Sequence, residues 1–350
     1  MSVRRPWLIP LTPLYSLVVV VKRRLYQWGW VKQNRLTAPV ISIGSVSAGG
    51  AGKTPFVAML ATMLQSRGYA VSILTRGYGR TSELIERVEP YDDPLWHGDE
   101  PVLLAQSCQV PVWAGADRYE AGLRAEQDKP KERIAVHLLD DGFQHLRLGR
   151  SVDIVLLTVE DTEDVVLPAG NLREPLHALR DASIVVIRED EEKQLRQELE
   201  ELREESSDTE GGFKIWVIRR SLSLLEGMET ILPTTPLAFC GIARPENFTK
   251  MLITSCYEPM ETMAFPDHHP YSEEDVTRLV DRARQIGANG FVTTEKDAVK
   301  FTPKMRTRLA EIGPLIIAKL RVTLVSEKEA FGQLVGLATD LDRRKNRERR

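Results

Sequence analysis

Residues 40–55 read Val-Ile-Ser-Ile-Gly-Ser-Val-Ser-Ala-Gly-Gly-Ala-Gly-Lys-Thr-Pro, and this stretch decides the fold. Its β-branched start predicts a buried strand, and its glycines predict a tight turn. After Pro55, apolar residues recur at helical spacing as Phe56, Val57, Met59, Leu60, Met63 and Leu64. A strand, a glycine-rich turn and a helix in this order are typical of a phosphate-binding loop.

The residue types in this loop suit the triphosphate of a nucleotide. Phosphate oxygens can be surrounded by the backbone N–H groups of Ser47, Ala48, Gly49, Gly50, Ala51 and Gly52. Lys53 can reach the terminal phosphates, and the Thr54 hydroxyl can bind Mg²⁺ at the start of the helix. The usual first glycine of such loops is replaced here by Ser47. We therefore expect a protein that handles a nucleoside triphosphate.

Composition limits the class of protein. With 350 residues and 42% hydrophobic content, the chain can form two domains or one large one. Its net charge of −3 argues against a general nucleic-acid binder, which needs a basic excess. The three cysteines, Cys108, Cys240 and Cys256, have no metal-binding spacing and suit a reducing compartment.

The N-terminal segment departs from this average. Residues 7–21 are almost wholly apolar, and residues 22–35 are rich in Lys, Arg, Trp and Tyr. The apolar part is too short to span a bilayer comfortably, and no small-residue cleavage site of a signal peptide follows it. We expect residues 1–35 to form an amphipathic segment that binds an anionic membrane surface. The alternative is an N-terminal helix packed in the core.

Short apolar runs alternate with helical patterns along the rest of the chain. Strands are expected at 70–74, 110–113, 134–139, 151–159 and 183–187, followed by a surface helix within 189–210. This alternation predicts an α/β fold of the P-loop NTPase type, with a mainly parallel sheet between helices. We expect a nucleotide-binding and catalytic lobe over 36–212 and a linker over 213–232. A second, smaller α/β lobe is expected over 233–350, ending in a basic, disordered tail at 343–350.

Acidic residues follow two of the predicted strands. Leu138-Leu139-Asp140-Asp141 resembles a second nucleotide-binding motif, and Asp141 is our first choice of Mg²⁺ ligand. Asp99 and Glu100 lie in the turn Gly-Asp-Glu-Pro between strands, where Glu100 is a further candidate metal ligand. The alternative for Asp140-Asp141 is that aspartates often end strands, and the alternative for Asp99-Glu100 is a solvated loop.

A histidine turn lies far downstream at 265–271, which reads Phe-Pro-Asp-His-His-Pro-Tyr. A carboxylate oriented by a histidine such as His268 can accept the proton of an attacking hydroxyl. The alternative is an ordinary surface turn. Three arginines in polar loops can hold anionic groups, although each can equally be a surface residue: Arg76, Arg118 and Arg173.

Seven stretches together make the chain resemble the tetraacyldisaccharide 4′-kinase family, the lipid A 4′-kinases of Gram-negative bacteria. In the family's order over nearly the whole chain, they are residues 42–55, 75–79, 98–101, 140–145, 170–176, 265–271 and 293–297. The chain departs from the family's frequent residues at Ser45, where Asn is usual, and at Ala51, where Thr is frequent. Both positions lie where the backbone matters most, so we expect activity to persist.

The resemblance implies phosphorylation of the 4′-hydroxyl of an acylated glucosamine disaccharide 1-phosphate, with ATP and Mg²⁺. It implies two lobes joined by a two-stranded link, and a monomer bound peripherally at the cytoplasmic face of the inner membrane. The family's catalytic base corresponds to Asp99, with His268 as its partner and Lys53 on the phosphates. Tyr78 and Asn171, which lie in the matching stretches, join the three arginines as candidate substrate-binding residues.

Two other classes compete with a kinase. A P-loop GTPase or metallochaperone-like nucleotide switch uses similar loops, but guanine recognition requires Asn-Lys-x-Asp, and residues 295–298 read Glu-Lys-Asp-Ala. A metallochaperone would also need Cys or His clusters. A membrane-bound nucleotide-binding scaffold would not explain the acidic pair Asp99-Glu100 or the His268 turn.

Overall fold

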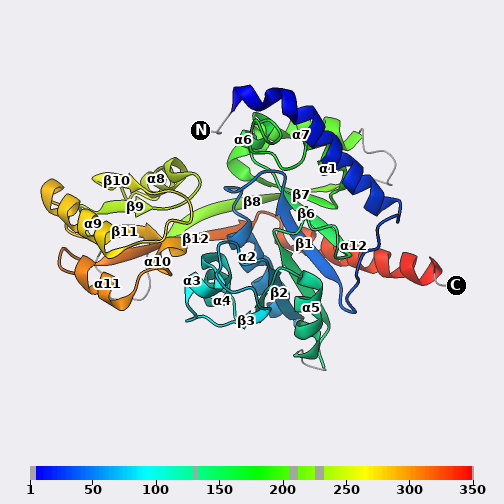
Figure 1. The fold of residues 1–350 in the computed structure, drawn as a ribbon, viewed down its shortest axis with the longest axis horizontal. Coiled ribbons are helices and arrows are strands. Elements are labelled where there is room, and N and C mark those ends of the chain that lie inside the picture. Colours follow the sequence, from blue (N-terminus) through cyan, green and yellow to red (C-terminus); the bar gives the residue numbers. More distant parts are fainter. Residues whose placement is uncertain (1–4, 129–131, 205–211, 225–231, 349–350) are drawn as a thin grey trace.

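The computed structural model describes residues 5–128, 132–204, 212–224 and 232–348. In this part of the chain, one 12-stranded sheet runs through both lobes in the order β10-β9-β11-β12-β8-β7-β6-β1-β5-β2-β4-β3. Most neighbouring strands are parallel, and helices cover both faces (Figure 1). The predicted α/β class, with a mainly parallel sheet between helices and a second lobe, is confirmed.

The first lobe contains the phosphate loop at the centre of its sheet. Its strands are β1 (Val40–Ser45), β2 (Ala70–Thr75), β3 (Glu86–Val88), β4 (Val112–Ala114), β5 (Ala135–Asp140), β6 (Val152–Leu156) and β7 (Ile184–Arg188). Its helices are α2 (Lys53–Ser66), α3 (Pro94–His97), α4 (Asp99–Ser107), α5 (Arg118–Gln127), α6 (Val159–Thr162), η2 (Leu176–Asp181), η3 (Glu189–Glu191) and α7 (Glu192–Glu204). β1 pairs in parallel with β5 and β6, so its carboxyl end opens at the sheet edge where ligands of such folds bind.

Alternating residues of these strands bury on opposite faces of the sheet. Ile41 and Ile43 pack with helices α2, α4 and α12 (Glu327–Glu348), whereas Val40 packs with α5. Helix α7 covers β6 and β7 on the second face through its apolar stripe of Leu195 and Leu199. The periodic apolar pattern after Pro55 thus forms the buried side of α2, as predicted.

The second lobe is a smaller version of the same layered design. Its strands are β9 (Leu237–Cys240), β10 (Glu261–Ala264) and β11 (Phe291–Thr294), which pair in parallel with one another and with the start of β12. Its helices are α8 (Pro245–Thr254), α9 (Glu273–Ile286), α10 (Glu295–Ala298) and α11 (Pro303–Leu309). Helices α9 and α11 cover one face of its sheet and α8 covers the other.

Two long strands join the lobes. β8 (Lys214–Ser223) pairs in parallel with β7, and β12 (Leu315–Leu324) pairs with β8 in the antiparallel sense. The linker expected over 213–232 therefore supplies only one of the two strands, and the other returns from the end of the second lobe. Residues 225–231 of that expected linker lie outside the described residues.

The chain ends on the first lobe. Ala330 and Leu334 of α12 are buried in the first-lobe core, and Gln333 accepts a hydrogen bond of 2.8 Å from Trp216 of β8. Helix α12 therefore packs on the first lobe, although the sequence analysis assigned residues 233–350 to the second lobe. The tail expected to be disordered from residue 343 continues this helix to Glu348.

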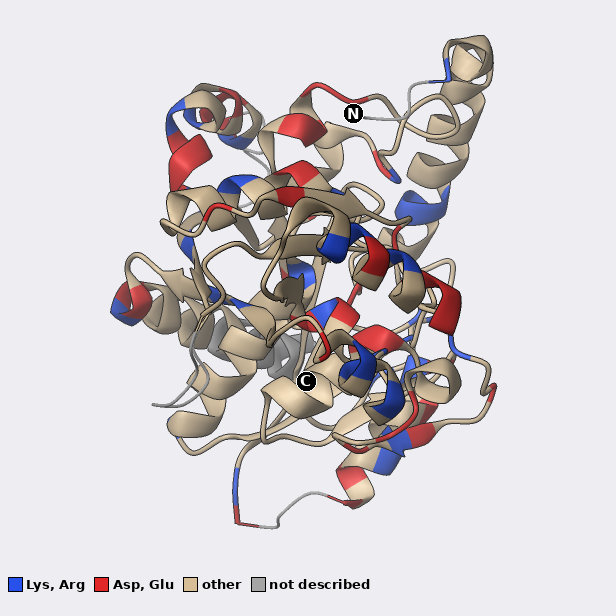
Figure 2. Ribbon diagram, turned by 90° about the vertical axis from the view of Figure 1, so that its left-hand side faces the viewer, with Lys and Arg blue, Asp and Glu red and all other residues tan. Residues whose placement is uncertain are grey.

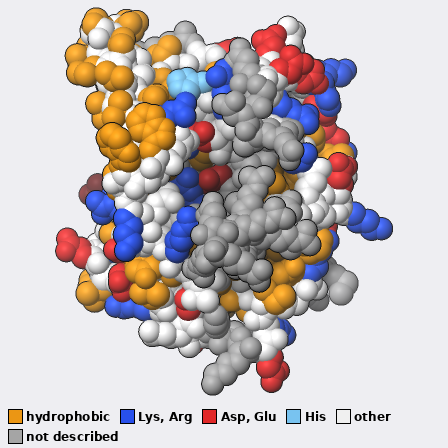
Figure 3. All heavy atoms as spheres, turned by 90° about the vertical axis from the view of Figure 1, so that its right-hand side faces the viewer, with side chains coloured by type: hydrophobic (Ala, Val, Ile, Leu, Met, Phe, Trp, Pro, Cys, Tyr) orange, Lys and Arg blue, Asp and Glu red, His pale blue; other side chains and the backbone are white. Residues whose placement is uncertain are grey.

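The N-terminal segment lies on the outside of the first lobe. It consists of η1 (Pro6–Leu11) and α1 (Thr12–Gln27), and its exposed apolar side chains gather at one corner of the molecule (Figure 3). They are Trp7, Ile9, Leu11, Leu14, Leu17, Val18, Val21, Trp28 and Trp30. Over the residues that the structure describes, none of the helices combines the length and apolar character that crossing a bilayer requires.

One buried ion pair fixes α1 to the rest of the lobe. Arg23 is only 7% exposed, and its guanidinium pairs with Glu174 while lying 4.3 Å from the ring centre of Phe143. Elsewhere on the ribbon, acidic and basic residues are interspersed (Figure 2).

Candidate active site

The phosphate loop begins where β1 ends and finishes at the first residue of α2. Gly49, Gly50 and Gly52 have φ angles of 83°, 78° and 81°, a left-handed conformation that residues with a Cβ rarely adopt. Gly52 is the N-cap of α2, so the loop delivers its N–H groups to the positive end of the helix. The backbone around Ser47 is held by the segment 171–174, which bonds to Val46 and Ala48.

Lys53 lies among groups that hold it at the loop. Its Nζ is 3.1 Å from the Ser45 hydroxyl and 3.4 Å from Oδ1 of Asp141. Arg173 contacts the other Asp141 oxygen at 2.7 Å. Burial of Asp141 disfavours its charged form, but Lys53 and Arg173 outweigh this effect and lower its pKa. Asp141 is therefore ionised, and two cations neutralise it.

Three carboxylates approach one another near the loop. Asp140 is buried and accepts a hydrogen bond of 3.0 Å from Thr75. Burial and the charges of Glu100 and Asp141 raise the Asp140 pKa. Mutual repulsion of this kind favours a bound cation, and carboxylate oxygens are donors that Mg²⁺ prefers. Within the described ranges, however, no three acidic, histidine or cysteine side chains form a ready metal site.

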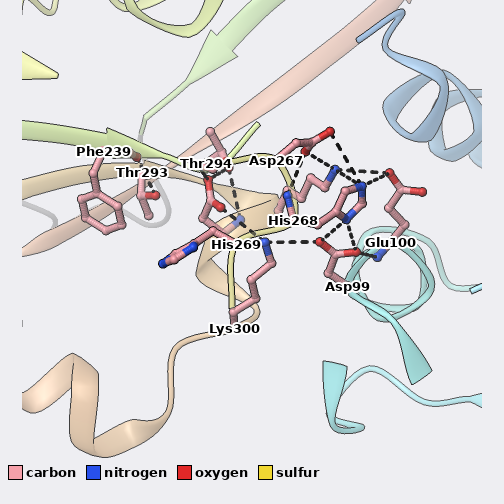
Figure 4. A network of polar contacts seen from close by, with 12 residues as sticks. Asp99, Glu100, Phe239, Asp267, His268, His269, Thr293, Thr294 and Lys300 are labelled. Atoms are coloured by element: carbon pink, nitrogen blue, oxygen red, sulfur yellow. Dashed lines mark hydrogen bonds and ion pairs between the residues drawn. The ribbon is translucent and has the colours of Figure 1, made fainter. Parts of the chain in front are cut away.

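Asp99 and His268 meet across the two lobes. Asp99 is the first residue of α4, and His268 lies in the second-lobe loop after β10, with a φ of 61°. The ring Nδ1 of His268 is 2.9 and 3.0 Å from the two oxygens of Asp99, as Figure 4 shows. The expected turn between strands at Asp99 is thus the first turn of a helix, which directs the carboxylate toward the second lobe.

Two lysines that sequence analysis did not select complete this network. Lys300 Nζ lies 3.3 Å from Asp99 (Figure 4). Lys296 Nζ lies 3.4 Å from Glu100 and 3.1 Å from His268 Nε2. Burial opposes ionisation of Asp99, but the His268 hydrogen bond and the two lysines lower its pKa to about 2. The same hydrogen bond raises the pKa of His268. The Thr-Thr-Glu-Lys-Asp stretch at 293–297 was the available signal for Lys296.

The structure places the candidate substrate-binding residues in different surroundings. Arg118 is 8% exposed, and burial together with the charge of Arg76 lowers its pKa to about 10. Tyr78 is exposed, and its ring centre lies 5.4 Å from that of His268. The Asn171 side chain instead donates to Asp164 at 3.0 Å, while its backbone carbonyl accepts the N–H of Ala48. Asn171 therefore supports the phosphate loop.

A cavity of about 720 Å³ lies between the lobes beside the loop. Its wall includes the loop from Gly49 to Thr54, and it also includes Glu100 and His268. Residues of α2, α4, β8, β12 and α8 line much of the remaining wall. A cavity of this size suits a nucleotide whose phosphates lie on the loop.

The chain resembles known proteins over nearly its full length. The sequence profile of the family described as "Tetraacyldisaccharide-1-P 4′-kinase" matches residues 4–338. The tetraacyldisaccharide 4′-kinase of Koribacter versatilis (strain Ellin345) is 37% identical over 333 residues, covering 93% of this chain and 97% of the relative. That of Aquifex aeolicus (strain VF5) is 36% identical over 308 residues, covering 85% and 90%.

A solved structure extends this similarity to three dimensions. The crystal structure of the "apo" form of LpxK from Aquifex aeolicus in complex with ATP has a TM-score of 0.70 and 31% sequence identity. The alignment covers 94% of this chain and 98% of the other.

Proposed function

The chain belongs to the tetraacyldisaccharide-1-phosphate 4′-kinase family, and on that premise we propose how its residues perform the transfer. The protein is a phosphotransferase of lipid A biosynthesis that moves a phosphoryl group from ATP to the 4′-hydroxyl of an acylated disaccharide 1-phosphate. The nucleotide-switch and scaffold alternatives do not fit this membership. The observation that carries the mechanism is the contact of 2.9 Å between His268 and Asp99.

Asp99 accepts the proton of the 4′-hydroxyl. As the new bond forms between the sugar oxygen and the γ-phosphorus, the bond to the ADP oxygen breaks, and the proton passes to an Asp99 oxygen. A carboxylate with a pKa of about 2 is always ionised at neutral pH but is a weak base. It therefore takes the proton late, when the hydroxyl has become acidic through bonding to phosphorus. His268 orients the carboxylate through its Nδ1.

The phosphates of ATP lie on the loop. The glycines with positive φ angles leave room for close approach of backbone N–H groups, and the buried Ser47 hydroxyl has no hydrogen-bond partner among the described residues. Lys53 neutralises charge on the terminal phosphates and gives up its ion pair with Asp141. Both observations fit an anion on this loop.

Mg²⁺ is held by Thr54, Asp141 and Glu100. The support is the position of Thr54 and Glu100 on the cavity wall, and the raised pKa of Asp140, which burial and the charges of Glu100 and Asp141 cause. When bound, the ion would neutralise the charge that develops on the phosphate oxygens.

The lipid substrate is bound at the anionic surface of the inner membrane, on its cytoplasmic face. The exposed apolar side chains of 7–30 insert at the interface, and the adjacent Lys and Arg residues attract anionic lipid. Arg76, Arg118 and Arg173 hold the substrate phosphate, with Tyr78 on the sugar. Because one chain supplies all these groups, a monomer suffices.

The test uses purified protein, labelled ATP and the tetraacyl disaccharide 1-phosphate in detergent. We expect label on the lipid and its loss in the Asp99→Asn variant. Hydrolysis of ATP without labelled lipid would contradict the assigned acceptor.

A further inference from the structure

An arginine of the second lobe reaches the first lobe beside the phosphate loop. Arg244 immediately precedes α8, at the carboxyl-end side of β9. Its Nη1 lies 3.2 Å from Glu160 and 3.4 Å from the Thr158 hydroxyl, and its Nη2 lies 3.7 Å from Asp161. These partners belong to α6 and its N-cap in the first lobe. The ion pair therefore crosses the cleft.

The same guanidinium lies against the phosphate loop. A Cβ placed on Gly50 would be 2.7 Å from Nε of Arg244, closer than real Cβ contacts allow. The positive φ of Gly50 is what requires glycine there, and the short distance shows how close the flexible Arg244 side chain lies to the loop backbone. Arg244 also lines the cavity of about 720 Å³ that contains Lys53 and Thr54.

The two acidic residues that contact Arg244 also contact other groups of the first lobe. Glu160 also lies 3.5 Å from Nη2 of Arg188, a second cation that remains beside it. Asp161 accepts the backbone N–H of Thr158 at 3.0 Å as part of a capping box. If Arg244 leaves, Glu160 therefore keeps a cation beside it and Asp161 keeps its capping hydrogen bond.

We propose that Arg244 is a phosphate-binding residue supplied by the second lobe, which exchanges Glu160 for the triphosphate when ATP enters the cavity. A triphosphate carries more negative charge than one carboxylate and offers several oxygens to the planar guanidinium. Because Arg244 and His268 belong to the same lobe, this contact also ties nucleotide binding to the position of His268. The inference rests on the proposed function only in requiring that ATP binds the loop.

The experiment compares ATP, ADP and AMP binding by calorimetry in the parent and four variants. Arg244→Gln should weaken ATP binding about 10-fold or more, as loss of a charge-assisted hydrogen bond does, with a smaller effect on AMP. Arg244→Lys should recover part of the ATP affinity. Glu160→Gln should leave ATP affinity equal to the parent's or increase it, because it removes the competing carboxylate. Arg219→Gln is the matched control, since Arg219 pairs with Glu189 at an exposed site.

Two results would overturn the inference. Equal losses of ATP affinity in Arg244→Gln and Glu160→Gln would mean that only their ion pair matters. Unchanged ATP affinity in Arg244→Gln, with lipid phosphorylation intact in the parent, would also reject the role. A parent that binds no ATP would instead reject the proposed function itself. Thermal unfolding of each variant shows whether its fold is retained.

Discussion

The phosphate loop and the Asp99–His268 pair are built in opposite ways. The loop is one continuous strand, turn and helix, and its lysine contacts groups of its own lobe. The pair joins side chains 169 positions apart that belong to different lobes. The loop therefore keeps its geometry when the lobes move, whereas the pair exists only at one relative position of the lobes. The phosphate loop is thus formed by local structure, whereas the Asp99–His268 contact depends on the tertiary arrangement.

The largest effect should come from substitutions in the phosphate loop. Lys53→Ala should lower kcat about 10²–10³-fold at saturating ATP and weaken ATP binding, because charge neutralisation on the phosphates is lost. Thr54→Ala should act in the same direction through Mg²⁺. Lys328→Ala, on the exposed start of α12, is the control for removing a lysine. Near-parent turnover in Lys53→Ala would show that the loop does not serve the reaction.

The next largest effect should come from substitutions in the Asp99–His268 pair, which should change kcat without changing the KM for ATP. Asp99→Asn should lower kcat about 10²-fold or more while leaving the KM for ATP near the parent value, because a general base acts only on the chemical step. His268→Ala should cost less. The double variant should be little worse than Asp99→Asn, since residues that act as a unit are not additive. Multiplicative losses would mean that the two residues act independently.

A third prediction concerns a region outside both sites. Trp28→Glu with Trp30→Glu should release the protein from anionic vesicles, because it replaces apolar burial with charge repulsion. Activity on detergent-dispersed lipid should largely persist. The control is Tyr91→Glu, which changes an aromatic residue that is 96% exposed elsewhere on the first lobe. Unchanged vesicle co-sedimentation would exclude this segment as the membrane contact.

The smallest effect should appear in the pH dependence of stability. The pKa of His268 is raised above its ordinary value of 6.5. The free energy by which the Asp99–His268 ion pair stabilises the folded protein is therefore complete below pH 6.5 and is lost as pH rises through the raised pKa. On the acid side, the lowered pKa of Asp99 keeps the contribution until pH falls from about 3.8 toward about 2. The difference in Tm between the parent and His268→Asn should therefore shrink from pH 6 to pH 9. A constant difference over this range would contradict the charged pair.

The same contrast explains what the sequence could predict. Strand β1, the glycine turn and α2 were predictable because each signal lies within a few consecutive residues. Asp99 and His268 could be connected only through resemblance to a family, since nothing local indicates their contact. Lys300 and Arg244 gave no such signal, because their roles depend on partners from elements distant in sequence.

The linker shows the same limit at the level of the fold. The sequence predicted a linker over 213–232, but not that β8 and β12 pair with each other. The first-lobe position of α12 was also missed, because Ala330 and Leu334 resemble the apolar side of any amphipathic helix. Pairing between strands that are distant in sequence produces no periodic pattern of residues from which it could be predicted.

The antiparallel pair β8 and β12 makes the two lobes parts of one uninterrupted sheet. Flexible connectors let domains swing freely, but a hydrogen-bonded ribbon resists stretching and yields mainly by twisting. The continuous hydrogen-bond ladder therefore restricts the relative positions of the two lobes more than a flexible linker would. Such a ribbon narrows the set of orientations that the lobes can take, and the contact between His268 and Asp99 therefore needs no search through many domain orientations.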